Sequence, residues 1–418
     1  MPENVNSEIG RLLVSVTSSV GFIPIKNATV KIYAERQSAD QERVLVETLN
    51  TNESGQTDRV DLPTPPRSLS QEPSEIRPYA EYDMEISAEG YEPVSISGSE
   101  VMSDELAVQN VEMNPLEEPN LVQSDILIPD HTLYGEYEAK IPEEEIKEVN
   151  ESGEIVLSRV VIPEYVVVHD GRPEDRSAKN YYVRYKDYIK NVASSEIYST
   201  WPEQAIYANV LCIMSFTLNR VYTEFYRGKG YDFTITSNTA FDQKWIYGRN
   251  IFENISYVVD SIFNNYLSRP GVNQPIFTSY CDGNRVTCKG LSQWGSKYLA
   301  DQGYSAIEII RYYYGNDMFI NSTNYISGIP SSYPGYDLTV GSRGAKVLQM
   351  QQQLNRIAQN YPAIPKIAAD GIFGVNTKRA VQTFQGIFLL PQSGIVDYPT
   401  WYQISNVYVA VTRIAEPG

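Results

Sequence analysis

Glu196 is the carboxylate whose surroundings best suit acid chemistry. Its sequence neighbours include Ile197, Tyr198 and Trp201, in the segment ASSEIYSTW. A partly apolar pocket disfavours a charged carboxylate and raises its pKa, so the group can hold a proton near neutral pH. Glu203 is a rival, but it lies at the expected start of a long helix, where a negative charge favours the helix dipole. From the residues alone, Glu196 is either a general acid or a structural carboxylate at a helix end.

The three cysteines and two histidines limit the possible covalent and metal chemistry. Cys281 and Cys288 lie seven positions apart in the loop-like segment YCDGNRVTC. They could form a local disulfide in an extracytoplasmic setting, and two free thiols are equally compatible with the sequence. Cys212 lies in an apolar run and is expected in the core. Because neither His131 nor His169 is near the cysteine pair in the sequence, we expect no metal site and no cofactor.

Composition and charge exclude several classes of protein. The chain has 418 residues, of which 42% are apolar and 21% charged, which suits two to four ordinary domains. Its net charge is −18, and residues 1–150 hold 30 acidic and 10 basic side chains. A polyanion such as nucleic acid is therefore not an expected partner. We also expect no membrane span, since no apolar run is long enough, and no signal peptide, since the N-terminus lacks a basic and an apolar region.

The first 160 residues are expected to form a β domain followed by a linker. Apolar and polar residues alternate in 11–17, 28–34 and 82–88, with turn residues between them. This pattern predicts an all-β sandwich over 1–113, and its order of strands and turns resembles the transthyretin-like sandwiches. Residues 114–160 contain several prolines and the acidic run PEEEIKE. They are expected to form an exposed acidic linker that is open to proteolysis.

The rest of the chain is expected to form two further domains, which makes the fold class multidomain. Residues 161–330 open with the strand-like YVVVH and continue with helical patterns over 185–194 and 202–227, which predicts an α+β domain. Residues 336–405 are expected to form a small three-helix domain. Thr377 and Thr400 each follow a glycine and an apolar segment, and we expect them to cap helices.

The last domain resembles the type-1 peptidoglycan-binding domains. The resemblance rests on matching residues in the expected order, namely Gly341, Gly344–Gln349, Gln353, Leu354, Asp370–Gly374, Thr377, Ala380, Val381, Phe384, Gln385, Gly394–Val396, Thr400 and Trp401. It implies that this domain binds the cell-wall polymer.

The central domain resembles the stage II sporulation protein D (SpoIID) family of lytic transglycosylases. The resemblance rests on YIKNVASSEIYSTWPEQAIYANVLCIMSFTL and on KGLSQWGSKYLADQGYSAIEIIRYYYG, which carries a Gly-x-Ser-Gln-aromatic-Gly turn. It implies that Glu196 is the catalytic acid, and it favours substrate contacts at Tyr198, Ser292, Gln293 and Trp294. Tyr207, Met214 and Thr287 stand where the family has Lys, Arg and His, so the basic contacts of the family do not carry over.

The order of the three domains resembles the SleC-type spore cortex-lytic enzymes. The resemblance implies a zymogen of the spore cortex or coat region, extracytoplasmic, that a subtilisin-like Csp germination protease cuts. Its substrate would be cortex peptidoglycan rich in muramic-δ-lactam, and its products would carry 1,6-anhydromuramoyl ends. We expect the cut between Gln123 and Ser124, and any exposed bond in 114–160 is the alternative. We also expect a steric plug over Glu196 before the cut.

Two other functions remain open. A muramidase would hydrolyse the same bond with water, and it would need a second carboxylate on the far face of the sugar. No paired acid motif stands out in the sequence. A wall-binding protein that activates another lysin would need no catalytic residue.

Overall fold

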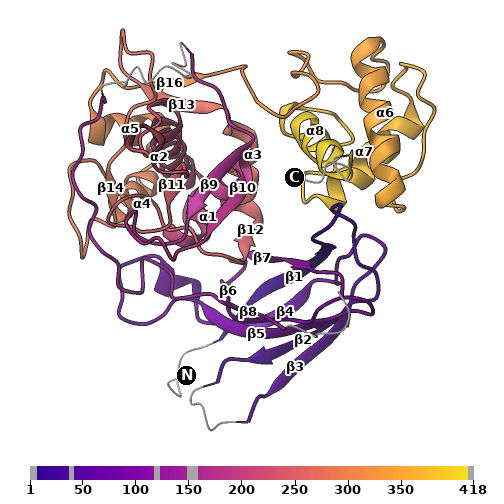
Figure 1. Cartoon of the computed structure of the whole chain (residues 1–418), viewed down its shortest axis with the longest axis horizontal. Coiled ribbons are helices and arrows are strands. Elements are labelled where there is room, and N and C mark those ends of the chain that lie inside the picture. The colour runs from indigo at the N-terminus through magenta and orange to yellow at the C-terminus, as the bar shows by residue number, and fades with distance from the viewer. Residues whose placement is uncertain (1–6, 37–41, 117–122, 148–158, 413–418) are drawn as a thin grey trace.

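The computed structural model describes residues 7–36, 42–116, 123–147 and 159–412. Figure 1 shows a β sandwich below, an α+β central domain at upper left and a helical domain at upper right. The chain is therefore multidomain, with a large β-rich N-terminal region and a C-terminal helical region. No helix in the described parts of the chain is long and apolar enough to cross a membrane.

The N-terminal sandwich consists of two sheets. One has the order β12-β7-β1-β4, with β1 Glu8–Ser18, β4 Val60–Thr64, β7 Leu106–Met113 and β12 Ile251–Phe252. The other has the order β3-β2-β5-β6-β8, with β2 Thr29–Ala34, β3 Leu45–Asn50, β5 Ala80–Ser87, β6 Val94–Val101 and β8 Ser124–Leu127. Alternate residues of β1, such as Leu12, Val14 and Val16, are fully buried between the sheets. Hydrophobic alternation therefore sets which face of each sheet points inward.

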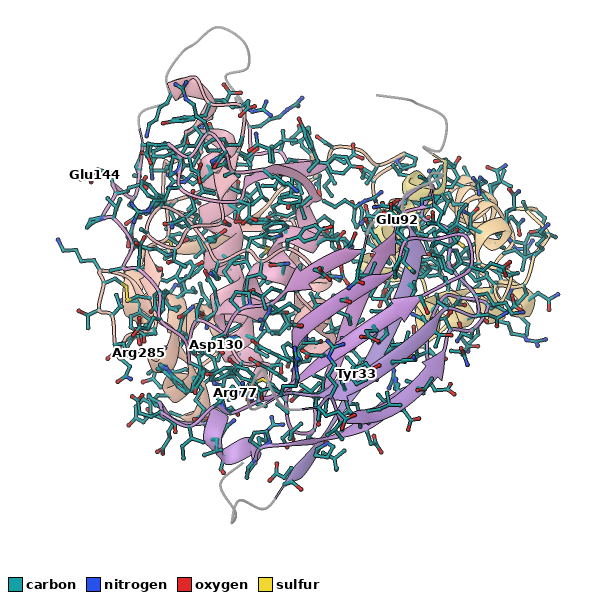
Figure 2. All side chains as sticks on the ribbon, turned by 60° about the horizontal axis from the view of Figure 1, so that its bottom comes forward. Tyr33, Arg77, Glu92, Asp130, Glu144 and Arg285 are labelled. Atoms are coloured by element: carbon teal, nitrogen blue, oxygen red, sulfur yellow. A yellow bond between two sulfur atoms is a disulfide. The ribbon has the colours of Figure 1, made fainter. Side chains whose placement is uncertain are left out.

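The sandwich does not end at residue 113, and the described residues 123–147 of the predicted linker contact the folded domains rather than forming a free chain. Strand β8 pairs in parallel with β6, Val94 lying opposite Ser124. Residues 128–147, here called the connector, have no regular secondary structure but pack on the central domain, and His131 and Leu133 are 1% and 5% exposed. Figure 2 shows the connector passing from Asp130, beside the sandwich, to Glu144 on the outer side of the central domain.

The acidic residues of the connector explain why it is bound rather than free. Glu143 accepts two hydrogen bonds from Arg220, at 2.8 and 2.6 Å, and the Arg220 side chain is fully buried. Glu145 accepts a hydrogen bond of 2.9 Å from Arg269. The acidic run alone is typical of a solvated linker, but its carboxylates form ion pairs with arginines that lie far away in the sequence.

The central domain is built around one long buried helix. Helix α2 (Glu203–Tyr222) begins directly after Pro202, which suits a helix start, and most of its residues are buried. A small sheet has the order β10-β9-β11. The other elements of this domain are β9 Tyr165–His169, β10 Asn180–Arg184, α1 Tyr185–Glu196, β11 Ile235–Thr236, α3 Glu253–Ile262, β13 Asn265–Ser268, β14 Tyr280–Cys281, β15 Leu291–Ser292, α4 Gln293–Asp301, α5 Ala306–Tyr314 and β16 Phe319–Ser322, with the 3₁₀ turn η2 Arg227–Lys229. A second 3₁₀ turn, η1 Arg67–Ser70, lies in the sandwich between β4 and β5.

The C-terminal domain has three helices, α6 Ala345–Asn360, α7 Val375–Ile387 and α8 Tyr398–Thr412. The predicted helix caps at Thr377 and Thr400 are wrong, because each threonine is the third residue of its helix. Their buried hydroxyls instead accept hydrogen bonds from Gln351 and Gln385, at 3.2 and 3.1 Å. Each glutamine also holds a glycine N–H of the preceding turn at 2.8 Å. The glycine, apolar segment and threonine that precede or begin both helices therefore belong to one packing arrangement that occurs twice.

The sandwich contacts both other domains. Strand β12 of the central domain pairs with β7, Ile251 lying opposite Val108. Leu389 of the helical domain packs against the small cluster of Leu13, Leu106 and Val108. Because a strand of one domain completes a sheet of another, the sandwich and the central domain are joined by main-chain as well as side-chain contacts.

Candidate active site

Glu196 is the last residue of α1, and its side chain points into the protein. The residue is 3% exposed, and its Oε1 accepts a hydrogen bond of 2.8 Å from the Lys244 backbone N–H. Oε2 has no partner at hydrogen-bonding geometry among the described residues, although the nearby Tyr280 hydroxyl acts to lower the pKa of this carboxyl. Burial outweighs these effects, and the pKa of Glu196 lies above its usual value.

Glu196 lines a small cavity in which it is the one carboxyl among the described residues. The lining residues are Thr132, Tyr137, Lys140, Glu196, Thr239, Tyr280, Cys281 and Gln293. The cavity volume is about 10 Å³, which is close to the space that one water requires. A sugar ring cannot enter a space of this size, so a lining element must move before a glycan could reach Glu196.

The connector supplies three of these residues and a positive charge. Thr132, Tyr137 and Lys140 belong to it, whereas the other five belong to the central domain. The Lys140 ammonium donates to the Asp242 carbonyl and lies 4.6 Å from the centre of the Tyr280 ring. Burial lowers the pKa of Lys140, and the Glu196 charge opposes that shift. In return, the Lys140 charge acts to lower the pKa of Glu196.

The predicted substrate-binding residues lie close to this cavity but in different roles. Gln293 is 4% exposed and lines the cavity directly. Ser292 caps α4, since its Oγ accepts the Gly295 N–H at 2.9 Å. Tyr198 is 2% exposed and packs edge-on against the half-buried Trp294, with ring centres 5.9 Å apart. The structure thus brings the two sequence motifs together, with Ser292 in a capping position and Tyr198 in a packing position. Glu203 is exposed at the first turn of α2.

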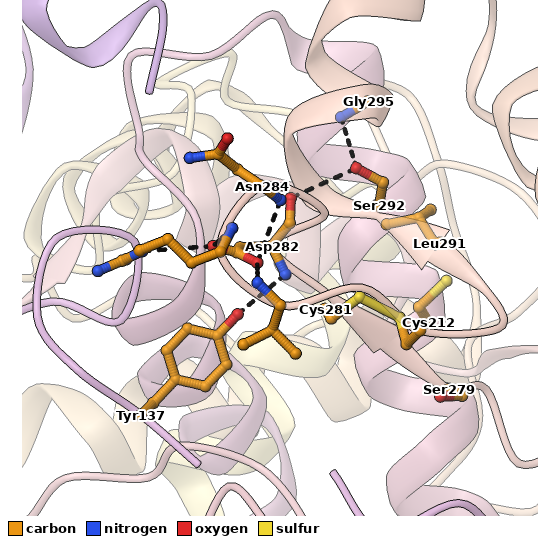
Figure 3. Close-up of a disulfide and its surroundings, with 12 residues drawn as sticks. Tyr137, Cys212, Ser279, Cys281, Asp282, Asn284, Leu291, Ser292 and Gly295 are labelled. Carbon is orange, nitrogen blue, oxygen red and sulfur yellow. Dashed lines mark hydrogen bonds and ion pairs between the residues drawn. A yellow bond between two sulfur atoms is a disulfide. The ribbon is translucent and has the colours of Figure 1, made fainter. Parts of the chain in front are cut away.

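A disulfide closes the loop beside the cavity (Figure 3). Cys281 and Cys288 are bonded to each other, and Cys212 is a buried free thiol. The fully buried Asp282 carboxylate accepts the backbone N–H groups of Asn284, Arg285 and Val286, at 3.3, 3.1 and 2.8 Å. We call residues 281–288 the disulfide loop. Its backbone is fixed by one covalent bond and one buried carboxylate.

The predicted processing bond lies at the start of an edge strand. Gln123 is exposed, and its amide donates to the Ser95 hydroxyl at 2.7 Å. Ser124 is the first residue of β8, and its N–H donates to the Pro93 carbonyl at 3.1 Å. This bond is therefore accessible on one side and already extended.

The sandwich also holds the connector in place. The Tyr79 hydroxyl accepts the His131 backbone N–H at 3.1 Å, and the Tyr79 ring packs edge-on against Tyr134 at 6.0 Å. The His131 ring lies 4.6 Å from that of Tyr198. Sequence reasoning missed Tyr137 and Lys140, because nothing in an acidic, proline-containing segment indicates which distant cavity it enters. It missed Arg285 because the loop that carries it gives no sign of its distant partners.

Comparison with known proteins gives one family match. Residues 343–404 match the model of the peptidoglycan binding domain family PG_binding_1. This match covers α6, α7 and the first half of α8, and it supports a cell-wall-associated, extracytoplasmic protein with peptidoglycan as its partner. No curated protein matches the chain.

Several solved structures are similar to part of the chain. The minor pilin GBS52 of Streptococcus agalactiae is 12% identical over 28% of this chain and 48% of its own, with a TM-score of 0.18. Catechol 1,2-dioxygenase from Acinetobacter sp. ADP1 is 14% identical over 30% and 60%, with a TM-score of 0.18. Transthyretin from Sparus aurata is 13% identical over 25% and 89%, with a TM-score of 0.16. The matches span less than two thirds of the pilin and the dioxygenase, and these TM-scores are too low to carry an argument.

Proposed function

We propose that the chain is the latent form of a peptidoglycan lytic transglycosylase, with Glu196 as its catalytic acid and base. The observation that carries this proposal is a lone carboxyl with a raised pKa in a cavity lined by polar and aromatic groups. Lytic transglycosylation needs one such group, whereas most glycosidases need two. The peptidoglycan-binding domain supports a wall glycan as the substrate.

The proposed reaction consumes no water. Protonated Glu196 gives its proton to the glycosidic oxygen as the bond from the muramoyl C1 breaks. The resulting carboxylate then takes the proton of the muramoyl 6-hydroxyl while that oxygen bonds to C1. A 1,6-anhydro ring forms, and the proton returns to Glu196. The Lys244 N–H, which donates to Oε1, fixes the orientation of the carboxyl through both steps.

We further propose that the connector is the plug that makes the enzyme latent. Three of its residues line the 10 Å³ cavity, and the sandwich residue Tyr79 holds it there. A cut between Gln123 and Ser124 would leave β8 and the connector on the same fragment as Glu196. Departure of the sandwich would then remove the Tyr79 contacts and the β6 partner of β8. The connector would lose its N-terminal anchor, and the cavity could open.

The natural substrate and the activating protease are part of the same proposal. The substrate would be spore cortex rich in muramic-δ-lactam, and the activating partner would be a subtilisin-like germination protease. N-terminal sequencing of the chain extracted from germinated spores tests the cut. A start at Ser124 supports the proposal, whereas a chain that keeps residue 1 in germinated spores contradicts it.

The decisive experiment compares Glu196→Gln with the native chain on purified cortex, after protease treatment of both. We expect the variant to release at least about 100-fold less glycan with anhydro ends, as measured by mass spectrometry. Glu203→Gln is the matched control and should keep full activity. Equal release by Glu196→Gln would overturn the proposal, and reducing ends in place of anhydro ends would indicate a hydrolytic muramidase.

A further inference from the structure

Arg285 extends from the disulfide loop with its base rigidly held. Its backbone N–H and its Nε both donate to the Asp282 carboxylate, at 3.1 and 3.4 Å. The Cys281–Cys288 bond closes the loop around it. The side chain is 35% exposed, so its outer end is accessible to groups from outside the central domain. Figure 2 shows Arg285 on the same side of the molecule as Asp130.

The outer end of Arg285 donates only to the connector, as far as the described residues show. Nη1 donates to the carbonyls of Tyr134 and Gly135, at 2.9 and 2.7 Å, and Nη2 donates to the Thr132 carbonyl at 2.8 Å. All three acceptors are neutral backbone oxygens. A fixed guanidinium therefore holds a row of carbonyl groups on a chain that crosses the cavity.

Arg285 is next to the Glu196 cavity through two independent links. Cys281, at the start of the same loop, lines the cavity, and so does Thr132, whose carbonyl Arg285 binds. Tyr137, a third lining residue, accepts the Asp282 N–H at 3.0 Å. Arg285 does not line the cavity itself, but its guanidinium binds a residue that does, beside the space that a glycan would enter when the connector leaves.

We propose that Arg285 is a substrate-binding residue that the connector backbone occupies in the latent chain. Its ligand would be an oxygen acceptor of the wall polymer, either an N-acetyl carbonyl or a stem-peptide carboxylate. A planar guanidinium with several N–H donors suits both acceptors. When the connector leaves, these donors lose their protein acceptors, and the rigid loop keeps them in position. This inference rests on the proposed function, because it takes the Glu196 cavity as the glycan site.

The test measures competition between a connector peptide and glycan strands for the site beside Glu196. Glycan that binds only to the wall-binding domain does not displace the peptide and so gives no signal. The full chain receives engineered protease sites at Gln123–Ser124 and after the exposed Glu144, so that the connector can be cut out and washed away. A fluorescent peptide of the excised residues 124–144 is then rebound. Peptide-free glycan strands and strands that keep their stem peptides are used as competitors. Arg285→Met is compared with Lys289→Met, a matched loss of charge at an exposed position of the same region.

We expect Arg285→Met to weaken the peptide and the competing glycan by roughly 10- to 100-fold each, and Lys289→Met to change neither by more than about 3-fold. A loss confined to peptide-bearing strands identifies a carboxylate ligand, and an equal loss for both strands identifies the N-acetyl carbonyl. A weaker peptide with unchanged glycan competition overturns the proposal, since Arg285 would then hold only the connector. All these binding measurements can also be made in the Glu196→Gln background. Their outcome therefore does not depend on whether Glu196 is catalytic.

Discussion

Glu100 and Arg249 join the sandwich to the central domain through an ion pair with no exposed side-chain surface. Arg249 Nη1 lies 2.7 Å from Glu100 Oε1, and the second nitrogen bonds both Glu100 Oε2 and the Ser194 carbonyl. Asn250 bonds the backbone N–H and carbonyl of Glu100, at 3.0 and 2.9 Å. Since Ser194 is two residues before Glu196, this interface is directly continuous with the candidate active site.

Breaking this pair should destabilise the joined domains strongly. Arg249→Met leaves the Glu100 carboxylate buried without its counter-charge, and we expect a loss of about 3–5 kcal/mol in the free energy of unfolding. The measurement is denaturant unfolding of the full chain. The exposed pair Arg59–Glu253 joins the same two domains at 3.5 Å, so Arg59→Met is a matched control with an expected loss below about 1 kcal/mol. Equal losses would show that the buried pair does not hold this interface.

Acid should weaken the chain through His131. Its Nδ1 accepts the Leu133 N–H at 3.1 Å and its Nε2 lies 3.3 Å from the Ile197 carbonyl, which fits a neutral ring. Burial, followed by the Arg249 charge, lowers the pKa of His131 well below its ordinary value. The unfolded chain binds a proton near pH 6.5, so stability is complete above that pH and falls as the pH decreases, by up to about 1.4 kcal/mol per pH unit.

Unfolding curves at pH 7.5, 6 and 5 measure this loss. The His131→Gln variant should be less stable at pH 7.5, yet lose less stability between pH 7.5 and 5 than the native chain. A substitution at the other histidine, His169→Gln, controls for the general effect of removing an imidazole. If His131→Gln shows the native slope, the acid sensitivity arises elsewhere.

The regular elements could be predicted because their patterns are local. The alternation of Leu12, Val14 and Val16 is visible in the sequence, and so is the proline before α2. The two-residue strand β12 could not be predicted, since its existence depends on pairing with β7, more than 140 positions earlier in the sequence. The end of the sandwich was likewise misplaced, because β8 is a short strand whose partner lies 30 residues earlier.

The features of the candidate site likewise fall into those that local sequence predicts and those that depend on the fold. The apolar neighbours of Glu196 are consecutive in sequence, so an acid in a buried pocket was a local prediction. The pairing of the connector with Arg220 and Arg285 depends on residues that the fold alone brings together. An acidic run looks the same whether it is solvated or bound to buried arginines, and this is why the connector was expected to be exposed.

Gly295 should be required for packing, independent of any role in binding. A Cβ at this position would lie 1.9 Å from the Tyr313 hydroxyl oxygen. We expect Gly295→Ala to cost about 1–3 kcal/mol in the free energy of unfolding, and Tyr313→Phe to restore part of that loss in the double variant. Gly374→Ala is the control, since nothing lies within 4 Å of its Cβ position. No recovery in the double variant would mean that the clash is not the cause.

The Cys281–Cys288 bond should both raise the free energy of unfolding and help to hold the connector over the cavity. Closing so short a loop stabilises a protein by about 2–3 kcal/mol in the chain-entropy model, so replacing both cysteines by serine should lower the free energy of unfolding by that amount. The same change should loosen the backbone that carries Arg285, which donates to three carbonyls of the connector.

Limited proteolysis separates these two consequences of losing the disulfide. If the loop holds the connector, the double serine variant is cut within residues 128–147 several times faster than the native chain, under conditions where both remain folded. A reducing agent should produce the same change in the native chain, and Cys212→Ala, at a buried thiol outside the loop, should not. Unchanged cutting with lowered stability would mean that the disulfide supports the central domain alone, and that Asp282 suffices to keep Arg285 on the connector.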